Sequence, residues 1–366
     1  MSIGLTAAVM VTVGEAYLRL TRSHASPDTH RAKSLEYEAT LFARHAFPRM
    51  VQKKRATPSG YVEISERGYR GRSFEVPKPP GVIRLVVLGG SAAFDMYAKE
   101  GRDWPHLIEE YLRAQGHTNV EVINAGTPGH ATFDSLGRLY SELWTFEPDY
   151  VLVYHAWNDI KYFHRLDSQT TLLRTQRPAM VTNDGGRPMV SNPFIYYWGP
   201  ADRLLSYSEL YVRLRSQYLF WRIGKPGSEG VVTDVNTYAS TYSAYGPRQY
   251  GLNLHLIMSA ARHIRARGIL ATQARLVTQS NTPAEKEKIA YELVELSPEA
   301  LLRAFEDSDR AIFKVAQAND VPVLDLSGIF TGRSELFEDH VHTTAAGSEA
   351  LARATAEFLR PMIGRR

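Results

Sequence analysis

Side chains that could do chemistry gather in four short segments of the chain. Ser91 ends the strand-like run from Ile83 to Ser91 (IRLVVLGGS), and NAGTPGHAT follows at Asn124 to Thr132. The other two segments are HAWND at His155 to Asp159 and EDHVHTTAAG at Glu338 to Gly347. A serine, an Asp/His pair and preorganised N–H donors are the parts of covalent acyl transfer. The four segments together therefore predict acyl-ester chemistry.

Each part of that chemistry has a candidate residue. Ser91 is the nucleophile, and His342 is the base that takes the proton of its hydroxyl. Asp339, three residues before His342, can bind the other imidazole nitrogen and fix the tautomer. The backbone N–H groups of Ser91 and Gly129 and the side-chain amide of Asn158 are the predicted oxyanion donors.

Alternating strands and helices are expected to bring these residues together. Short apolar runs predict strands at Ile83–Leu88, Val120–Ile123, Tyr150–Tyr154, Ile269–Val277 and Val321–Leu326. Helical patterns lie between and after them, at Trp104–Gln115, Ser135–Trp144, Leu252–Arg267, Pro298–Ala318 and Ala345–Leu359. This alternation predicts an α/β fold with a flavodoxin-like, five-strand parallel sheet covered on both faces. Because ligands bind at the carboxyl ends of such strands, residues following the first three strands should meet at one edge.

Other interpretations of the segments compete with this one. The loop GGSAAF matches neither the GxGxxG nor the GK[ST] pattern of phosphate-binding turns. Asp339, His340 and His342 alone could bind a metal, but no HExxH or carboxylate cluster accompanies them, and we predict no metal. Strand-like geometry would turn His340 away from the site. Phe133–Leu136 looks like a GDSL box, yet it follows no strand, so Ser135 is expected at a helix N-terminus.

Composition narrows the class of protein. The chain has 366 residues, of which 44% are hydrophobic and 22% charged, as expected for a globular protein with a large core. It has no cysteine, which excludes disulfides, thiolate metal sites and a cysteine nucleophile. The net charge is only +4 and the basic residues are scattered, which argues against a nucleic-acid partner.

The chain is expected to have three parts. Residues 1–20 form either a membrane anchor or an amphipathic helix, and residues 21–80 form an irregular extension ending in the stiff run Pro77–Gly81. Residues 81–366 form the main domain, interrupted at about 165–249 by a long insertion. The insertion is either a helical subdomain or a lid, and is rich in aromatic residues: Tyr196, Tyr197, Trp198, Tyr207, Tyr211, Tyr218, Phe220, Trp221, Tyr238, Tyr242 and Tyr245.

The four segments resemble blocks I, II, III and V of the SGNH, or GDSL, hydrolase superfamily. Block I resembles Gly89-Gly90-Ser91-Ala92, with glycine and alanine where the family has aspartate and leucine. Block II resembles Asn124–Gly129, and block V, Asp-x-x-His, resembles Asp339 to His342. Block III, usually Gly-x-Asn-Asp, is Ala156–Asp159 here, and its Trp157 is expected to narrow the pocket. The resemblance covers residues 82–160 and 320–360 well and the middle poorly.

The resemblance implies a three-layer α/β/α sandwich and a serine ester hydrolase without a cofactor. The residues around Asn158, namely Trp157, Asp159 and His155, are expected to contact substrate. The lead-in from Arg67 to Pro80 looks like that of members with an N-terminal membrane anchor, which often act on cell-surface glycans. An extracytoplasmic location is therefore expected, periplasmic or membrane-anchored, with a cytoplasmic location as the alternative.

Three functions stay open from the sequence. The first is an esterase that removes a short acyl group, such as acetyl, from a carbohydrate or similar alcohol. The second is an O-acyltransferase that passes the same acyl-serine to a sugar hydroxyl of a cell-surface glycan. The third is an inactive carbohydrate-binding domain derived from such an enzyme. The expected partner is a small-molecule or glycan acyl ester, and the N-terminus is the only candidate for membrane association.

Overall fold

The computed structural model describes residues 11–17, 54–163 and 238–363, together with short pieces between 181 and 235. The chain divides into two compact units, one made of Met1–Phe42 and Arg174–Thr233, the other of Ala43–Leu173 and Asp234–Arg366. The first unit contains a helical turn at 11–17 and a two-strand antiparallel pair, β6 (Val181–Thr182) and β7 (Pro188–Met189). All the residues that the sequence singles out for chemistry belong to the second unit.

Five parallel strands form the centre of the second unit. They are β3 (Ile83–Gly89), β4 (Val120–Gly126), β5 (Tyr150–Tyr154), β8 (Arg267–Ala271) and β9 (Val323–Leu324), in the order β4-β3-β5-β8-β9. The central strands are almost wholly buried, as their continuous apolar sequences predict. This is the flavodoxin-like order, and the predicted fold class is confirmed.

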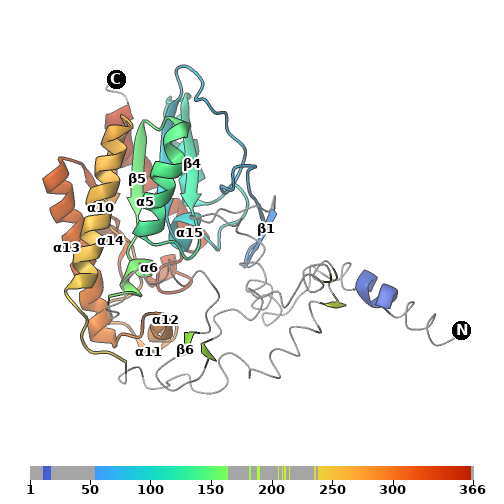
Figure 1. Ribbon diagram of the computed structural model, residues 1–366, viewed down its shortest axis with the longest axis vertical. Helices are drawn as coiled ribbons and strands as arrows, with labels where there is room; N and C mark the ends of the chain where they lie inside the picture. Colours follow the sequence, from blue (N-terminus) through green and yellow to red (C-terminus); the bar gives the residue numbers. More distant parts are fainter. Residues whose placement is uncertain are drawn as a thin grey trace, which may run out of the picture. The chain divides into compact units, whose positions relative to one another are not determined.

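Helices cover both faces of this sheet (Figure 1). On one side α4 (Trp104–Ala114) packs with α15 (Ala345–Ile363), and on the other α10 (Tyr245–His263) packs with α5 (Thr132–Ser141) and α13 (Pro298–Asn319). The first residues of α13 show how the sequence sets the start of a helix. Ser297 accepts a hydrogen bond from the Ala300 N–H, and Pro298 occupies the first helical position. The helices predicted from the sequence are all present, and the largest shift of an end is at the start of α10, which begins seven residues earlier than Leu252.

The fourth predicted strand is too long. It was expected to run from Ile269 to Val277, but β8 ends at Ala271 because its neighbour β9 pairs only with Leu270 and Ala271. Beyond that point the chain leaves the sheet, and the Leu276 N–H donates to the carbonyl of His340 at 2.9 Å. The segment after β8 is therefore bound to the loop that carries His342.

The extension predicted to be irregular at 21–80 contains ordered structure that supports the main domain. Strands β1 (Lys54–Thr57) and β2 (Gly60–Glu63) form a tight hairpin, whose turn needs Gly60 at a φ of +125°. Further along, Arg70 is wholly buried, pairs with Asp103 at 3.0 Å and donates to the carbonyls of Phe94 and Asp95. The prediction of an irregular segment is wrong here, because these contacts reach residues distant in sequence.

The remaining predictions about domains are not decided by the described residues. Most of the aromatic insertion lies outside them, but α10 begins at Tyr245, so the last residues assigned to the insertion belong to that helix. Tyr242 packs its ring against Phe163 at 5.6 Å and donates to Asp307 at 2.7 Å. No helix of the described residues has the length and apolar character needed to cross a membrane. Residues 1–10 lie outside them, and the anchor stays a prediction.

Candidate active site

Two glycines position Ser91 at the end of the central strand β3. Helix α3 (Ser91–Phe94) begins directly after them. A Cβ on Gly89 would lie 2.3 Å from the Ala93 Cβ, and a Cβ on Gly90 would lie 2.5 Å from the amide nitrogen of Asn158. Only glycine therefore lets the strand turn so sharply and lets Asn158 approach this closely.

Ser91, His342 and Asp339 form one chain of hydrogen bonds. The Nε2 atom of His342 lies 2.7 Å from the Ser91 Oγ, and its Nδ1 atom lies 2.7 Å from the Asp339 Oδ2. Asp339 Oδ1 also accepts from the backbone N–H groups of Val341 and His342, which fixes the turn. Because an ionised carboxylate only accepts, Nδ1 carries the proton and Nε2 is left to accept from the serine.

The charges of Asp339 and His342 favour the hydrogen bond between them. Burial by itself raises the pKa of the Asp339 carboxyl, but its attraction to His342 and the hydrogen bond between them outweigh burial. The net result holds the pKa of Asp339 below its usual range. The carboxylate therefore stays ionised and can stabilise an imidazolium on His342 when the proton of Ser91 is transferred.

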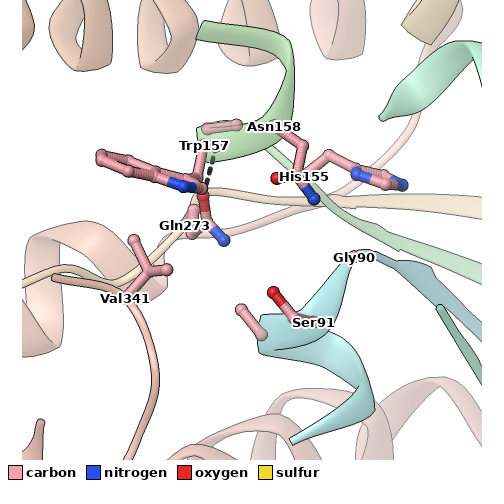
Figure 2. Close-up of a pocket in the computed structure, with 9 residues that line it drawn as sticks. Gly90, Ser91, His155, Trp157, Asn158, Gln273 and Val341 are labelled. Carbon is pink, nitrogen blue, oxygen red and sulfur yellow. Dashed lines mark hydrogen bonds between the residues drawn. The ribbon is translucent and has the colours of Figure 1, made fainter. Parts of the chain in front are cut away.

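Asn158 lies where an oxyanion donor is needed. It belongs to the short helix α6 (Trp157–Ile160) after β5, and its Nδ2 donates to the His130 carbonyl at 2.9 Å. That bond uses one of the two amide hydrogens, and the second is available on the side of Ser91. Figure 2 shows the amide nitrogen directed toward the Gly90–Ser91 turn.

Gly129 sits in a turn whose geometry requires glycine. The His130 N–H donates to the Thr127 carbonyl at 3.1 Å, Pro128 occupies the second position, and Gly129 has a φ of +82°. Gly129 is exposed and is not among the residues that line the pocket at Ser91. Its role as an oxyanion donor stays a prediction.

A small pocket opens beside Ser91 (Figure 2). It is lined by residues that follow β3, β5 and β8 and by the loop before His342: Gly90, Ser91, Ala92, His155, Ala156, Trp157, Asn158, Gln273 and Val341. Trp157 is 3% exposed, and its ring lies 3.8 Å from the ring of His340 and 6.1 Å from that of Phe305. The large, fixed indole limits the pocket on one side, in line with the narrowing expected from the sequence.

The side chains of Asp159 and His155 make hydrogen bonds to other residues of the protein. Asp159 accepts from both the N–H and the hydroxyl of Thr132. The His155 Nε2 lies 2.8 Å from the Ser135 Oγ, and in Figure 2 its ring is turned away from Ser91. His155 lines the pocket and Asp159 does not. The substrate contacts expected of both residues stay predictions.

Ser135, His155 and Asp159 form a second serine, histidine and aspartate set. The His155 Nδ1 lies 4.0 Å from Asp159, and all three residues are about 2% exposed. Burial lowers the pKa of His155 to about 3, so this imidazole is a poor proton acceptor. Ser135 lies in the first turn of α5, as expected, and no substrate can reach it. The two sets have the same residue types, and burial distinguishes them.

Sequence reasoning missed several residues that support the site. Thr343, next to His342, donates to Asp95 at 3.0 Å, and Asp95 also accepts from the Trp104 N–H at 2.9 Å. Burial raises the pKa of the Asp95 carboxyl to about 6. These bonds tie the helix that carries Ser91 to the loop that carries His342. No local pattern marks Asp95, because its partners lie up to 248 residues away.

Asp339, His340 and His342 also bring ligand-type atoms within 4.8 Å of one another. In the described geometry, however, both nitrogens of His342 are engaged by Asp339 and Ser91. A metal on His342 would therefore have to displace either Asp339 or Ser91 from one ring nitrogen. The predicted absence of a metal stays a prediction, but the hydrogen-bonded chain competes directly with metal binding.

Comparison with known proteins gives distant structural matches. No protein-family model and no curated protein sequence matches this chain. Among solved structures, the acetyl xylan esterase AlAXEase matches with 14% identity and a TM-score of 0.42, covering 76% of this chain and 100% of its own. A lipase/acylhydrolase from Enterococcus faecalis matches with 17% identity and a TM-score of 0.43, covering 77% and 97%. A mutant acetyl-xylooligosaccharide esterase from Geobacillus Stearmophilus matches with 14% identity and a TM-score of 0.43, covering 78% and 95%.

Similarity at this level does not identify the reaction of this chain. The identities are low and the TM-scores lie below 0.5. The functional assignment therefore rests on the site geometry.

Proposed function

We propose that this protein is a serine ester hydrolase of the SGNH type that removes a short acyl group from an alcohol. The observation that supports this most is the chain from Asp339 through His342 to Ser91, with 2.7 Å at each link and the serine at the mouth of a pocket. This is the geometry that activates a serine hydroxyl, which is otherwise a weak nucleophile.

The reaction follows from the positions of these groups. The Ser91 Oγ forms a bond to the acyl carbon while its proton moves to the His342 Nε2, and the carbonyl electrons move onto oxygen. That oxyanion is stabilised by the Asn158 amide and the Ser91 N–H. When the intermediate collapses, the bond to the alcohol breaks and His342 returns the proton to the leaving oxygen. Water then attacks the acyl-serine by the same route, and free acid leaves.

The pocket favours a small acyl group. The fixed ring of Trp157 and the side chain of Val341 take up room beside Ser91. An acetyl group fits such a space, whereas a long chain would have to displace the buried indole. The alcohol is proposed to be a carbohydrate on the strength of the SGNH resemblance, and an extracytoplasmic location is proposed on the same ground.

The first test is covalent labelling. Intact-protein mass should show one fluorophosphonate adduct on the wild type and none on Ser91→Ala. Ser135→Ala is the matched control, because Ser135 belongs to the buried second set and should leave labelling unchanged. An unlabelled wild type, or labelling that survives Ser91→Ala, would refute the proposal.

A second measurement identifies the acceptor. The wild type is given p-nitrophenyl acetate with and without a high concentration of xylose or glucosamine, and free acetate and acetylated sugar are quantified. Free acetate as the main product in both cases supports a hydrolase. Acetylated sugar as the main product would show an O-acyltransferase that uses the same serine.

A further inference from the structure

Gln273 occupies a position that the sequence analysis did not single out. It follows strand β8, which lies next to β5 in the sheet, as β5 lies next to β3. Ser91, Asn158 and Gln273 therefore follow three consecutive strands at one edge, and all three line the same pocket. Gln273 is 4% exposed, so its amide faces the pocket rather than bulk water.

A backbone hydrogen bond fixes the orientation of the Gln273 amide. The Trp157 N–H donates to the Gln273 Oε1 at 2.7 Å. An N–H group can be accepted only by the oxygen of an amide, so the other end must be the NH₂ group. Figure 2 shows this nitrogen on the side of the amide that faces Ser91 and Asn158.

Within the described residues, the side chain of Gln273 makes one hydrogen bond, accepted by Oε1 from the Trp157 N–H, so its NH₂ group has no protein partner there. Such a donor is satisfied only when water or a ligand in the pocket accepts a hydrogen bond from it. Here the unsatisfied donor lies in the pocket where the substrate carbonyl must bind. The donor is also neutral, so it stays available over the whole pH range in which the enzyme folds.

We propose that the Gln273 Nε2 is an oxyanion donor that acts beside Asn158. This rests on the proposed function, since it assigns Gln273 a contact with the reacting ester. In the tetrahedral intermediate one Nε2 hydrogen binds the anionic oxygen, while Oε1 keeps its bond to the Trp157 N–H. The bond to Oε1 also holds Trp157, the residue before Asn158. The side chain of Gln273 would therefore supply one donor and help to orient the Asn158 amide.

Two variants separate the donor from the positioning role. Gln273→Met removes both ends of the amide, whereas Gln273→Glu keeps an acceptor for the Trp157 N–H and removes the donor. The readout is the ratio of kcat/KM for p-nitrophenyl acetate to that for its thionoacetate analogue, in which sulfur replaces the carbonyl oxygen. Sulfur is a weak hydrogen-bond acceptor, so the ratio reports hydrogen bonds to that atom. The negative charge of Glu repels the anionic tetrahedral intermediates of both substrates to a similar extent. This effect therefore largely cancels in the ratio.

We expect kcat on the ester to fall about 100-fold in Gln273→Met, as for loss of one oxyanion donor. We expect the ester-to-thionoester ratio to fall at least about tenfold in both variants. Asn319→Leu is the control, because it removes a buried amide at the far end of α13 and should keep the wild-type ratio. Wild-type ratios in Gln273→Glu would overturn the inference and leave only a positioning role.

Failure of the inference and failure of the proposed function give different results. A wild type that neither hydrolyses p-nitrophenyl acetate nor reacts with the fluorophosphonate refutes the proposed function, and the inference falls with it. A wild type that is active and labelled at Ser91, with unchanged ratios in the Gln273 variants, refutes the inference alone. Thermal melting of each variant shows whether it is folded. If Gln273→Met does not fold, Gln273→Glu alone provides the test.

Discussion

Replacing His340 with phenylalanine should remove part of the acid sensitivity of this protein. His340 is 4% exposed, and its ring lies 3.8 Å from that of Trp157. Neither ring nitrogen has a hydrogen-bond partner among the described residues, and the nearest carboxylate oxygen, on Asp339, is 3.6 Å away. Burial lowers the pKa of His340 to about 3, and the attraction of Asp339 offsets this only in part.

The size of the effect follows from proton linkage. Below the ordinary histidine pKa of 6.5 the unfolded chain binds a proton at this position, but the folded protein does not until about pH 3. The unfolded state therefore gains protons first, and the free energy of unfolding falls as the pH falls through this window. At about 1.36 kcal/mol per pH unit, the loss between pH 6.5 and pH 4 is about 3 kcal/mol.

Phenylalanine does not titrate and keeps the stacked contact with Trp157. We therefore expect His340→Phe to match or slightly exceed the wild type in stability at pH 7. At pH 4 the variant should be about 3 kcal/mol more stable relative to the wild type. The opposing contribution of Asp95, whose raised pKa lowers stability as the pH rises from 3.8 to about 6, is present in both proteins and cancels.

The assay is urea unfolding followed by circular dichroism at pH 7, 6, 5 and 4. The control is His263→Phe, which removes an exposed imidazole from α10 and so shows what a histidine outside the core contributes. Equal pH dependence of wild type and His340→Phe would refute the reasoning, because it would mean that the folded protein accepts the proton at this position as readily as the unfolded chain.

Two further changes test the catalytic geometry. Asp339→Asn should lower kcat on p-nitrophenyl acetate about 10⁴-fold, because the amide no longer fixes the tautomer of His342, and a loss below about tenfold would contradict this. Gly90→Ala should lower kcat about 100-fold with little change in thermal melting, since the new Cβ would lie 2.5 Å from the Asn158 nitrogen and displace that donor. Gly251→Ala is its control, because a Cβ there meets only ordinary contacts at 3.9 Å, and equal activity of the two variants would argue against the predicted displacement.

The sequence was sufficient to predict the sheet and the position of Ser91 at its carboxyl edge. Strands that are buried on both faces, such as Tyr150–Tyr154, leave a continuous apolar run that is visible without structure. The turn at Gly89–Ser91 follows such a run directly, so its place at the carboxyl edge follows from the fold class alone. Asp339 and His342 are three residues apart, and a single tight turn brings them together.

Residues whose partners are distant in the sequence could not be predicted in this way. Gln273 meets Trp157 across 116 residues, and Arg70 meets the turn after Ser91 across 24 and 25 residues. Neither belongs to a periodic pattern or a spaced motif. A lone glutamine after a strand and an arginine in a polar stretch have the composition of ordinary surface positions. Only the folded structure shows that one lines the pocket and that the other is wholly buried.

The two serine, histidine and aspartate sets show why residue types alone do not define a catalytic site. Ser135 and His155 are as close as Ser91 and His342, at 2.8 Å and 2.7 Å. In the buried set, however, burial lowers the pKa of His155 to about 3, and its aspartate accepts from Thr132. In the set at the pocket, Asp339 directs its Oδ2 atom to the histidine and stays ionised. A base must be able to hold a proton during the reaction, so we expect turnover to depend on the Ser91 set and Ser135→Ala to leave it intact.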